Sequence, residues 1–289
     1  MSGKSETITY IALDKLIPFP DHPFAVREDE AMTQTVESVK EYGVIVPAIA
    51  RPLADGTYEL ISGHRRKRAC EIAGLTTMPV IVRDIDRDAA TILMVDSNLQ
   101  RENILPSERA KAYKMKMEAI KRSAGRPSKE NCAQVEHNFQ GKRGVEVIAD
   151  QVGESRAQVQ RYIRLTELAP QLQQMVDEGK IGIIPAVELS FLTPTEQTLL
   201  LDTIESEQVT PSLSQAQRMK KLSREGRLND DTMLGIMSEQ KKPESWNLSL
   251  PMDKIRKYFP KSYSPQRMEE TIIKLLEGWM RKRQRDNHL

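Results

Sequence analysis

The sequence predicts an α+β protein in which a small mixed α/β domain precedes an all-helical region. Two observations support this class. In the first 122 residues, short strand-like runs such as 57–62 alternate with helical patterns. From Gly144 onward, apolar residues recur every three or four positions, with prolines as breaks. A hydrophobic content of 39% provides enough apolar material for cores in both regions.

The first region is predicted to contain short strands separated by helices. Gly43 and Gly74 follow two of the helices and are typical helix ends. A strand and a turn are expected over 6–18, and the prolines at 18, 20 and 23 keep the next stretch extended. The other predicted strands are 45–52, 57–62 and 78–84, and the predicted helices are 29–42, 64–73, 87–98 and 106–122.

Two stretches without periodicity divide the chain into parts. Residues 123–144 and 241–252 are rich in polar residues and are predicted to be linkers. The expected parts are therefore an α/β domain over 1–122, a helical domain over 145–240 and a helical C-terminal segment over 253–289. Met268, Ile272, Leu275, Leu276 and Trp279 form an apolar stripe on the last segment, which is suited either to dimerisation or to packing within the chain.

Composition excludes several classes of protein. No apolar run approaches the roughly 20 residues of a membrane helix, and the first residues lack the apolar core of a signal peptide. Cys70 and Cys132 are too few for a disulfide framework. We therefore expect a cytoplasmic protein without a membrane partner. Because the net charge is only +2, any nucleic-acid surface must come from local clusters of cations.

The first such cluster lies where a predicted strand ends and a helix begins, at Gly63-His64-Arg65-Arg66-Lys67-Arg68. The first turn of a helix offers unpaired N–H groups and a positive dipole end, so it binds anions. Cations placed in that turn oppose the dipole unless a ligand compensates them. This pattern predicts a phosphate site, with packing against acidic neighbours as the alternative.

A second polar run, from Asn98 to Asn103, follows the apolar segment 90–95. Asn98, Gln100 and Arg101 cannot all face a core unpaired. The run is therefore either a polar helix end or the second wall of a pocket shared with the first cluster.

A third pattern, over 145–165, matches a helix-turn-helix. Ala149, Gly153 and Val159 fall at the close-approach, turn and core positions of that motif. Ser155 is a good N-cap for the second helix. We expect its outward side chains to read base edges in a major groove, where Arg pairs with guanine and Gln with adenine. With Ser155 these are Arg156, Gln158, Gln160, Arg161 and Arg164; an αα-hairpin within a bundle is the alternative.

Together, these motifs resemble the ParB/RepB family of chromosome and plasmid partition proteins. The resemblance covers residues 8–225 and rests on the order and spacing of five pieces: the extended segment 17–27, the run 42–47, the Gly63-to-Arg66 box, the Asn98-to-Arg101 box and the helix-turn-helix. It implies a ParB-type nucleotide-binding N-terminal domain and a homodimer that binds a palindromic centromere-like site, parS. It also implies that CTP closes the dimer into a DNA clamp, and that the partner is a ParA-type ATPase.

The resemblance also assigns roles to residues. Gly63, Arg65 and Arg66, with His64 between them, would bind the triphosphate. Asn98 would help to hold Mg²⁺, and Gln100 and Arg101 would contact the nucleotide or the facing protomer. His64 and Ser97 stand where this family usually has glutamate, and Asp96 precedes Ser97. Because Mg²⁺ favours carboxylate and phosphate oxygens, the resemblance leaves CTP hydrolysis open.

Two other functions stay open at this point. One is a transcription or nucleoid-occlusion regulator built on the same fold. The other is an ATP-using enzyme, because sulfiredoxin and a kinase of free serine share the N-terminal fold. Sulfiredoxin-like chemistry needs a cysteine just before the His-Arg pair, where this chain has Ser62 and Gly63.

Overall fold

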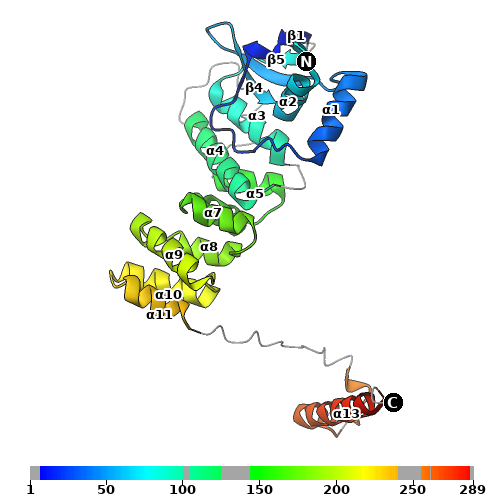
Figure 1. The fold of residues 1–289 in the computed structure, drawn as a ribbon, viewed down its shortest axis with the longest axis vertical. Coiled ribbons are helices and arrows are strands. Elements are labelled where there is room, and N and C mark those ends of the chain that lie inside the picture. Colours follow the sequence, from blue (N-terminus) through cyan, green and yellow to red (C-terminus); the bar gives the residue numbers. More distant parts are fainter. Residues whose placement is uncertain (1–6, 100–103, 125–143, 240–254, 261, 287–289) are drawn as a thin grey trace. The chain divides into compact units, whose positions relative to one another are not determined.

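The structure is a computed structural model, and it describes residues 7–99, 104–124, 144–239, 255–260 and 262–286. Its contacts divide the chain into two compact units, residues 1–239 and 240–289, each described by itself. The two predicted linkers lie almost entirely outside the described residues. The α+β class is confirmed: a mixed α/β domain at the start of the chain is followed by helices (Figure 1).

A five-stranded sheet forms the centre of the N-terminal part, in the order β1-β5-β3-β4-β2. Pairing is antiparallel between β1 and β5 and between β3 and β4, and parallel between β3 and β5 and between β2 and β4. The strands are β1 (Ile8–Ala12), β2 (Leu16–Pro18), β3 (Ala48–Pro52), β4 (Tyr58–Ser62) and β5 (Thr77–Val82).

All four predicted strand stretches differ in their bounds from the structure, although β4 begins only one residue later than predicted. The predicted 6–18 stretch is broken by a 3₁₀ turn, Leu13–Lys15. Strand β3 begins at Ala48 rather than at residue 45, because the carbonyls of Val46 and Pro47 accept hydrogen bonds from the Arg66 side chain. Strand β5 ends at Val82, two residues before the predicted end.

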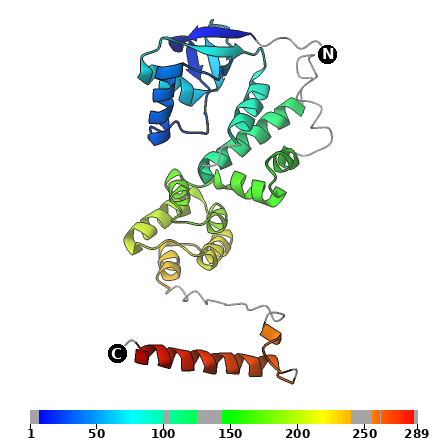
Figure 2. The same ribbon diagram turned by 90° about the vertical axis from the view of Figure 1, so that its right-hand side faces the viewer.

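Helices cover both faces of the sheet because its strands alternate their side chains between two cores. On β4, Leu60 belongs to a core with α1 and α2, whereas Ile61 belongs to a core with α3. Figures 1 and 2 show α3 and α4 lying side by side. The helices of this part are α1 (Glu30–Tyr42), α2 (His64–Ala73), α3 (Arg87–Leu99) and α4 (Pro106–Ala124).

Helix α4 is shared between two cores. Ala112 packs in the core that contains α3 and the segment 19–24, while Tyr113 and Ile120 pack in the core of the helices that follow. Its N-terminal turn is fixed from outside the helix, because Ser107 donates from its backbone N–H to the Asp177 carboxylate at 2.9 Å. One helix therefore connects the α/β part to the helical part.

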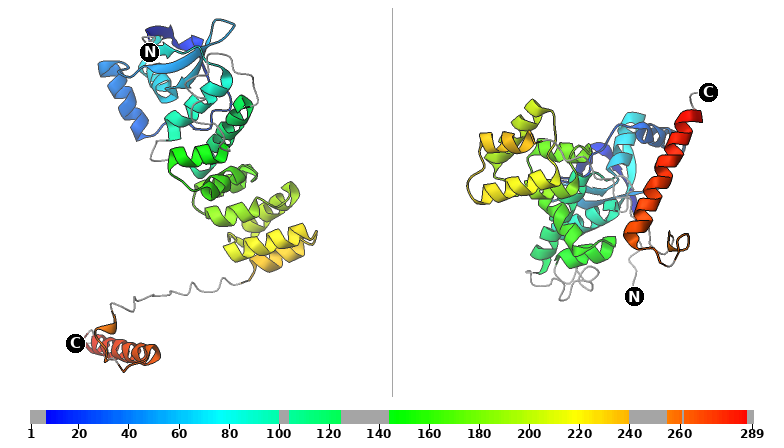
Figure 3. Two further views of the ribbon diagram at one scale, coloured as in Figure 1. Left: turned by 180° about the vertical axis from the view of Figure 1, so that it is seen from behind. Right: turned by 90° about the horizontal axis from the view of Figure 1, so that it is seen from below.

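Seven further helices follow among the described residues of the first unit, and the left view of Figure 3 shows them from behind. Three of them begin with capping boxes, at Thr193, Ser212 and Asn229, which satisfy the first free N–H groups. They are α5 (Gly144–Val152), α6 (Arg156–Leu165), α7 (Pro170–Asp177), α8 (Ile183–Leu189), α9 (Pro194–Glu207), α10 (Leu213–Arg224) and α11 (Asp230–Met237).

The second unit contains α13 (Pro265–Asp286), the longest described helix of the chain. Met268 is buried, whereas Leu275, Leu276 and Trp279 leave 58–67% of their surface exposed within this unit. The predicted apolar stripe is therefore largely uncovered in a single copy of the unit. Within the described ranges, no helix combines the length and apolar character needed to cross a bilayer.

The turn that starts α2 gives a direct test of the fold. Gly63 adopts φ +110°, and a Cβ atom there would lie 2.8 Å from Ala48 Cβ, a buried atom of β3. Gly63→Ala should therefore destabilise the protein by more than the roughly 1–2 kcal/mol that left-handed backbone alone costs an L residue. Chemical denaturation measures the difference.

Gly74→Ala is the matched control at the other end of α2. Gly74 is also left-handed, at φ +77°, but no atom lies within 4 Å of its added Cβ. Gly74→Ala should therefore lower the free energy of unfolding only by the cost of the left-handed backbone conformation. Equal losses for the two variants would contradict the close approach of Gly63 to Ala48.

Candidate nucleotide and DNA sites

The Gly63-to-Arg66 box lies at the predicted strand-to-helix junction, with Gly63 as the N-cap of α2. The Gly63 N-cap has no side chain to satisfy the free N–H groups of the first turn, which leaves them able to bind an anion. The Arg66 guanidinium donates to the backbone carbonyl of Val46 and to that of Pro47, the latter at 2.7 Å. Arg66 thereby holds the segment before β3 against the start of α2.

Acidic side chains accompany the three other cations of the cluster, and Lys67 pairs with Glu71 at 3.3 Å. Arg65 donates to the Asp29 carboxylate at 3.1 Å, and Arg68 to that of Glu28 at 2.5 Å. The Arg65 guanidinium, together with the Met32 N–H, holds the pKa of Asp29 below its usual value. Packing against acidic neighbours, the alternative to a phosphate site, thus describes Arg65, Lys67 and Arg68 in the structure. A phosphate at this turn would compete with Asp29 for Arg65.

His64 stacks on a second imidazole. The ring centroids of His22 and His64 are 3.9 Å apart, at an interplanar angle of 44°. The Phe19 N–H donates to His64 Nε2 at 3.5 Å, and His22 Nδ1 donates to the Phe24 carbonyl at 2.8 Å. These contacts connect the segment 19–24 to the first residue of α2. No local sequence pattern predicts this connection.

Asn98 is buried in the last turn of α3, with 3% of its surface exposed. Its amide donates to the Met94 carbonyl at 2.8 Å and to Ser97 Oγ at 3.3 Å. Gln100 and Arg101, the other residues of this box, lie outside the described residues.

The residues around Asn98 fit a Mg²⁺ ion poorly. Ser97 offers a hydroxyl in place of a carboxylate, and the Asp96 carboxylate pairs with the Lys116 ammonium. Across the described ranges, no group of three or more His, Cys, Asp or Glu side chains is arranged to hold a metal. We therefore assign no chemical step to a metal.

The helix-turn-helix forms at its predicted place. Ser155 caps α6, and its hydroxyl accepts from the Gln158 N–H at 3.2 Å. Ile148 and Ala149 of α5 and Val159 of α6 are buried in the shared core. Arg109 of α4 reaches this motif, donating to Glu154 at 2.8 Å and lying 5.3 Å from the centre of the Tyr162 ring.

Most of the polar side chains predicted to read DNA lie on the solvent side of α6. Gln160 and Arg161 are exposed, and the Arg156 side chain is 69% exposed while it pairs with Glu146 at 2.9 Å. Arg161 donates to the half-buried Gln158 at 3.3 Å. The outward side of α6 therefore presents Arg and Gln side chains.

Arg164 differs from the expectation that it points outward. Its guanidinium is half-buried and donates to Ser190 Oγ at 3.0 Å and to the Ser190 carbonyl at 2.8 Å. The physical reason is that α8 packs against the end of α6, so that side chain is held inside the helical part.

Arg164 also belongs to a group of cations around one aromatic ring, here called the Phe191 cluster (Arg164, Phe191, Lys220 and Arg224). The Arg164 Cζ, Lys220 Nζ and Arg224 Cζ atoms lie 4.2, 3.7 and 5.5 Å from the ring centroid. Glu188 pairs with Lys220 at 2.7 Å. Arg161 and Arg164 are neighbours at i, i+3 spacing on α6, so the cluster lies beside the exposed Arg161 although Arg164 itself turns toward α8.

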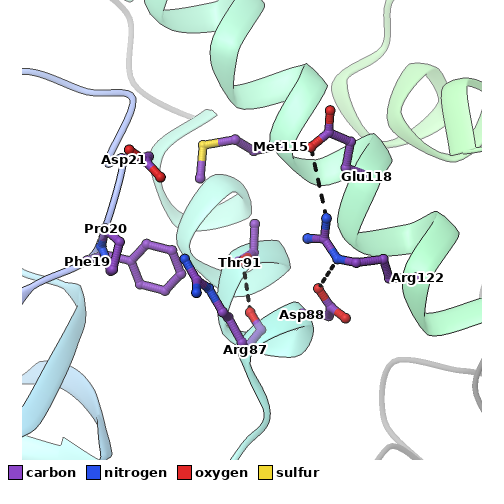
Figure 4. Close-up of a pocket in the computed structure, with 9 residues that line it drawn as sticks. All are labelled: Phe19, Pro20, Asp21, Arg87, Asp88, Thr91, Met115, Glu118 and Arg122. Carbon is purple, nitrogen blue, oxygen red and sulfur yellow. Dashed lines mark hydrogen bonds and ion pairs between the residues drawn. The ribbon is translucent and has the colours of Figure 1, made fainter.

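A pocket of about 420 Å³ opens between the segment 19–21, α3 and α4. In Figure 4, Arg122 lies between Asp88 and Glu118 on its wall. None of its lining residues belongs to α2 or to the Asn98 box. The pocket is therefore separate from the residues predicted to bind nucleotide, and no function is assigned to it.

Cys70 lies inside α2 and is fully buried. Burial raises the pKa of its thiol, so the reactive thiolate is disfavoured. This geometry does not provide the exposed nucleophile that sulfiredoxin-like chemistry requires.

The fold and these surfaces define the class of the protein: an α/β domain with a cationic helix start, joined to a helix-turn-helix region. The family model described as "ParB N-terminal domain" matches residues 1–99, and the one described as "ParB HTH domain" matches residues 138–226. The chain belongs to the ParB family, as its motifs predicted.

Individual relatives are similar over most of this chain but over less of their own length. The chain is 30% identical over 178 residues to "Stage 0 sporulation protein J" of Bacillus subtilis, covering 62% of this chain and 55% of that protein. It is 30% identical over 191 residues to "Chromosome-partitioning protein Spo0J" of Thermus thermophilus, covering 66% of this chain and 62% of that protein.

A solved structure is also similar. It is the C-terminally truncated chromosome-partitioning protein ParB of Caulobacter crescentus complexed to the centromeric parS site, with a TM-score of 0.42 and 25% identity. The similarity covers 75% of this chain and 99% of that one.

Several residues of these surfaces were not singled out from the sequence. Asp29 and His22 contact the α2 box from 36 and 42 positions away, and no local pattern connects them to it. Lys116 did leave a signal, because it interrupts the apolar stripe of Tyr113 and Ile120 at a core position of α4.

Proposed function

We propose that this chain is a sequence-specific DNA-binding protein of chromosome or plasmid partition. It binds a palindromic, parS-like site as a homodimer through α5 and α6. The observation that carries the proposal is the outward face of α6, where Arg156, Gln160 and Arg161 stand on a capped second helix. Membership of the ParB family supports the partition role.

Two kinds of DNA contact follow from the geometry. Arg156, Gln160 and Arg161 read base edges, with Gln158 and the cap residue Ser155 beside them. The Phe191 cluster contacts phosphates, because it gathers three cations with one paired carboxylate, Glu188, and Phe191 is 37% exposed. Arg164 acts within this cluster, where it is held by Ser190.

A triphosphate binds at the start of α2, with CTP as the nucleotide that the family resemblance implies. Gly63 allows close approach of the phosphates, the first-turn N–H groups point at them, and Arg65 and Arg66 supply charge. His64 completes this wall, and Gln100 and Arg101 contact the nucleotide or the second protomer. The phosphates displace Asp29 from Arg65.

Nucleotide binding closes the dimer into a clamp on DNA, with a ParA-type ATPase as the partner. The exposed apolar stripe of α13 provides a surface for a second copy. We also propose that the chain consists of an α/β domain over 1–122, a helical domain over 145–240 and a C-terminal segment over 253–289. Since no metal step is assigned, hydrolysis is not part of it.

The direct test of base reading is Arg161→Ala. Loss of one good base contact should weaken binding to the cognate duplex by about 1–3 kcal/mol, with little change for unrelated duplexes. Fluorescence anisotropy with both duplexes measures the effect. Arg218→Ala on α10 is the control, because Arg218 is exposed and pairs with Glu239 away from the Phe191 cluster. Unchanged cognate binding by both Arg161→Ala and Arg156→Ala would remove α6 as the reading helix.

Arg224→Ala tests the phosphate contacts of the Phe191 cluster. The variant should bind all duplexes more weakly to a similar degree. The slope of the logarithm of the binding constant against the logarithm of the salt concentration should become shallower by the contribution of about one phosphate contact. Titrations over a range of KCl concentrations give the slope. A salt dependence equal to that of Arg218→Ala would mean that the cluster faces away from DNA.

Two substitutions at the nucleotide site should change the affinity for CTP in opposite directions. Arg65→Ala should abolish CTP binding and leave DNA affinity nearly intact. Asp29→Asn should bind CTP several-fold more tightly, because asparagine still caps α1 while the charge that competes for Arg65 is gone. Isothermal titration with CTP measures both, and retained CTP binding by Arg65→Ala would refute the assignment.

A further inference from the structure

Helix α4 carries a lysine in its buried face. The Lys116 side chain has 0% of its surface exposed, although lysine is among the residues least often found inside proteins. Its ammonium donates to the Asp96 carboxylate of α3 and to the carboxamide oxygen of Gln151 in α5. Three helices thus meet at one buried cation.

This arrangement is costly compared with an apolar side chain. A buried ammonium loses its hydration, and an ion pair at such a site is often no more stable than well-packed hydrophobic residues. Burial accordingly lowers the pKa of Lys116, and Asp96 offsets part of that shift. Tyr113 and Ile120 on the same face of α4 show that an apolar residue would suit the position.

The two partners of Lys116 lie close in sequence to the Asn98-to-Arg101 box and to the reading helix α6. Asp96 immediately precedes Ser97 and Asn98, the buried last turn of α3. Gln151 lies in the first helix of the helix-turn-helix, four residues before the Ser155 cap of α6. If the last turn of α3 moved away, the buried Lys116 ammonium would lose its counter-charge, an unfavourable change although Asp96 leaves 39% of its own side chain exposed. Movement of α3 therefore requires adjustment of α4 and α5.

We propose that Lys116 is a positioning residue that couples nucleotide binding to DNA binding. The coupling runs from the last turn of α3 through Asp96, Lys116 and Gln151 to the helix-turn-helix. This inference rests on the proposed function, because it presupposes that the chain binds both a nucleotide and a duplex.

The test is Lys116→Met, which keeps an unbranched, flexible side chain that is one atom shorter and removes the charge. In the unmodified chain, CTP should change the affinity for a cognate duplex, and the duplex should change CTP affinity by the same factor, typically about 5- to 150-fold. In Lys116→Met, each ligand should still bind alone, but this factor should fall to within about twofold of one. The melting temperature should be equal or higher.

Lys114→Met is the matched control. Lys114 lies on the same helix but is partly exposed and pairs with Glu167 at 3.1 Å. This variant should keep the full coupling factor. Gln151→Ala changes an exposed residue that the fold tolerates, and it cuts only the connection to α5. It should reduce the coupling factor without loss of folding.

Asp96→Asn separates coupling from simple stability. Asp96→Asn should lower the melting temperature, because Lys116 then lacks a counter-charge, and the double variant with Lys116→Met should restore the temperature but not the coupling. A structural role alone would change melting temperatures and leave the coupling factor intact.

The outcomes are distinguishable. If Lys116→Met or Gln151→Ala keeps the full coupling factor, the inference is overturned while the proposed function stands. If the unmodified chain binds the duplex but CTP does not change that binding, the inference is overturned and DNA recognition stands. If it binds neither ligand, both the inference and the proposed function fail.

Discussion

The packing of α4 is the constraint on which the rest of the first unit depends. One face of this helix buries Ala112 against α3, and another buries Tyr113 and Ile120 with α5 and the helices that follow. Its start is fixed by Asp177 of α7, and by Glu108, whose carboxylate accepts from the Ala25 N–H at 3.0 Å. Helix α3, which ends at the Asn98 box, and the two helices of the helix-turn-helix are therefore positioned against a single helix, whereas α2 packs in the separate core that contains α1.

Local patterns predicted those parts of the fold whose causes are local. Helix α2 begins and ends at the predicted residues because Gly63 and Gly74 adopt left-handed backbone conformations at its two ends. The helix-turn-helix formed as expected because its spacing and its Ser155 cap are properties of one short segment. Strand β3, by contrast, starts three residues late because Arg66 binds the carbonyls of Val46 and Pro47 from 20 and 19 positions away. Sequence periodicity contains no information on such a contact.

The same division holds for the candidate sites. The cationic turn and the outward face of α6 were visible in the sequence, because charge and helical spacing are local. The partners of those side chains were not. Asp29 beside Arg65, His22 beside His64 and Ser190 beside Arg164 come from other elements, and they change what each cation is able to do. Lys116 shows the intermediate case, since its place in an apolar stripe was visible but its partners were not.

The central claim is that a nucleotide and a duplex bind at two separate, named places of one chain. Hydrogen–deuterium exchange with mass spectrometry tests this claim most directly, on the full chain with CTP alone, a parS-like duplex alone, and both. CTP alone should slow exchange in residues 43–47 and the first turn of α2, and the duplex alone should slow it in α6. A first turn of α2 that CTP leaves unprotected, or a duplex that leaves α6 unchanged, would contradict the account.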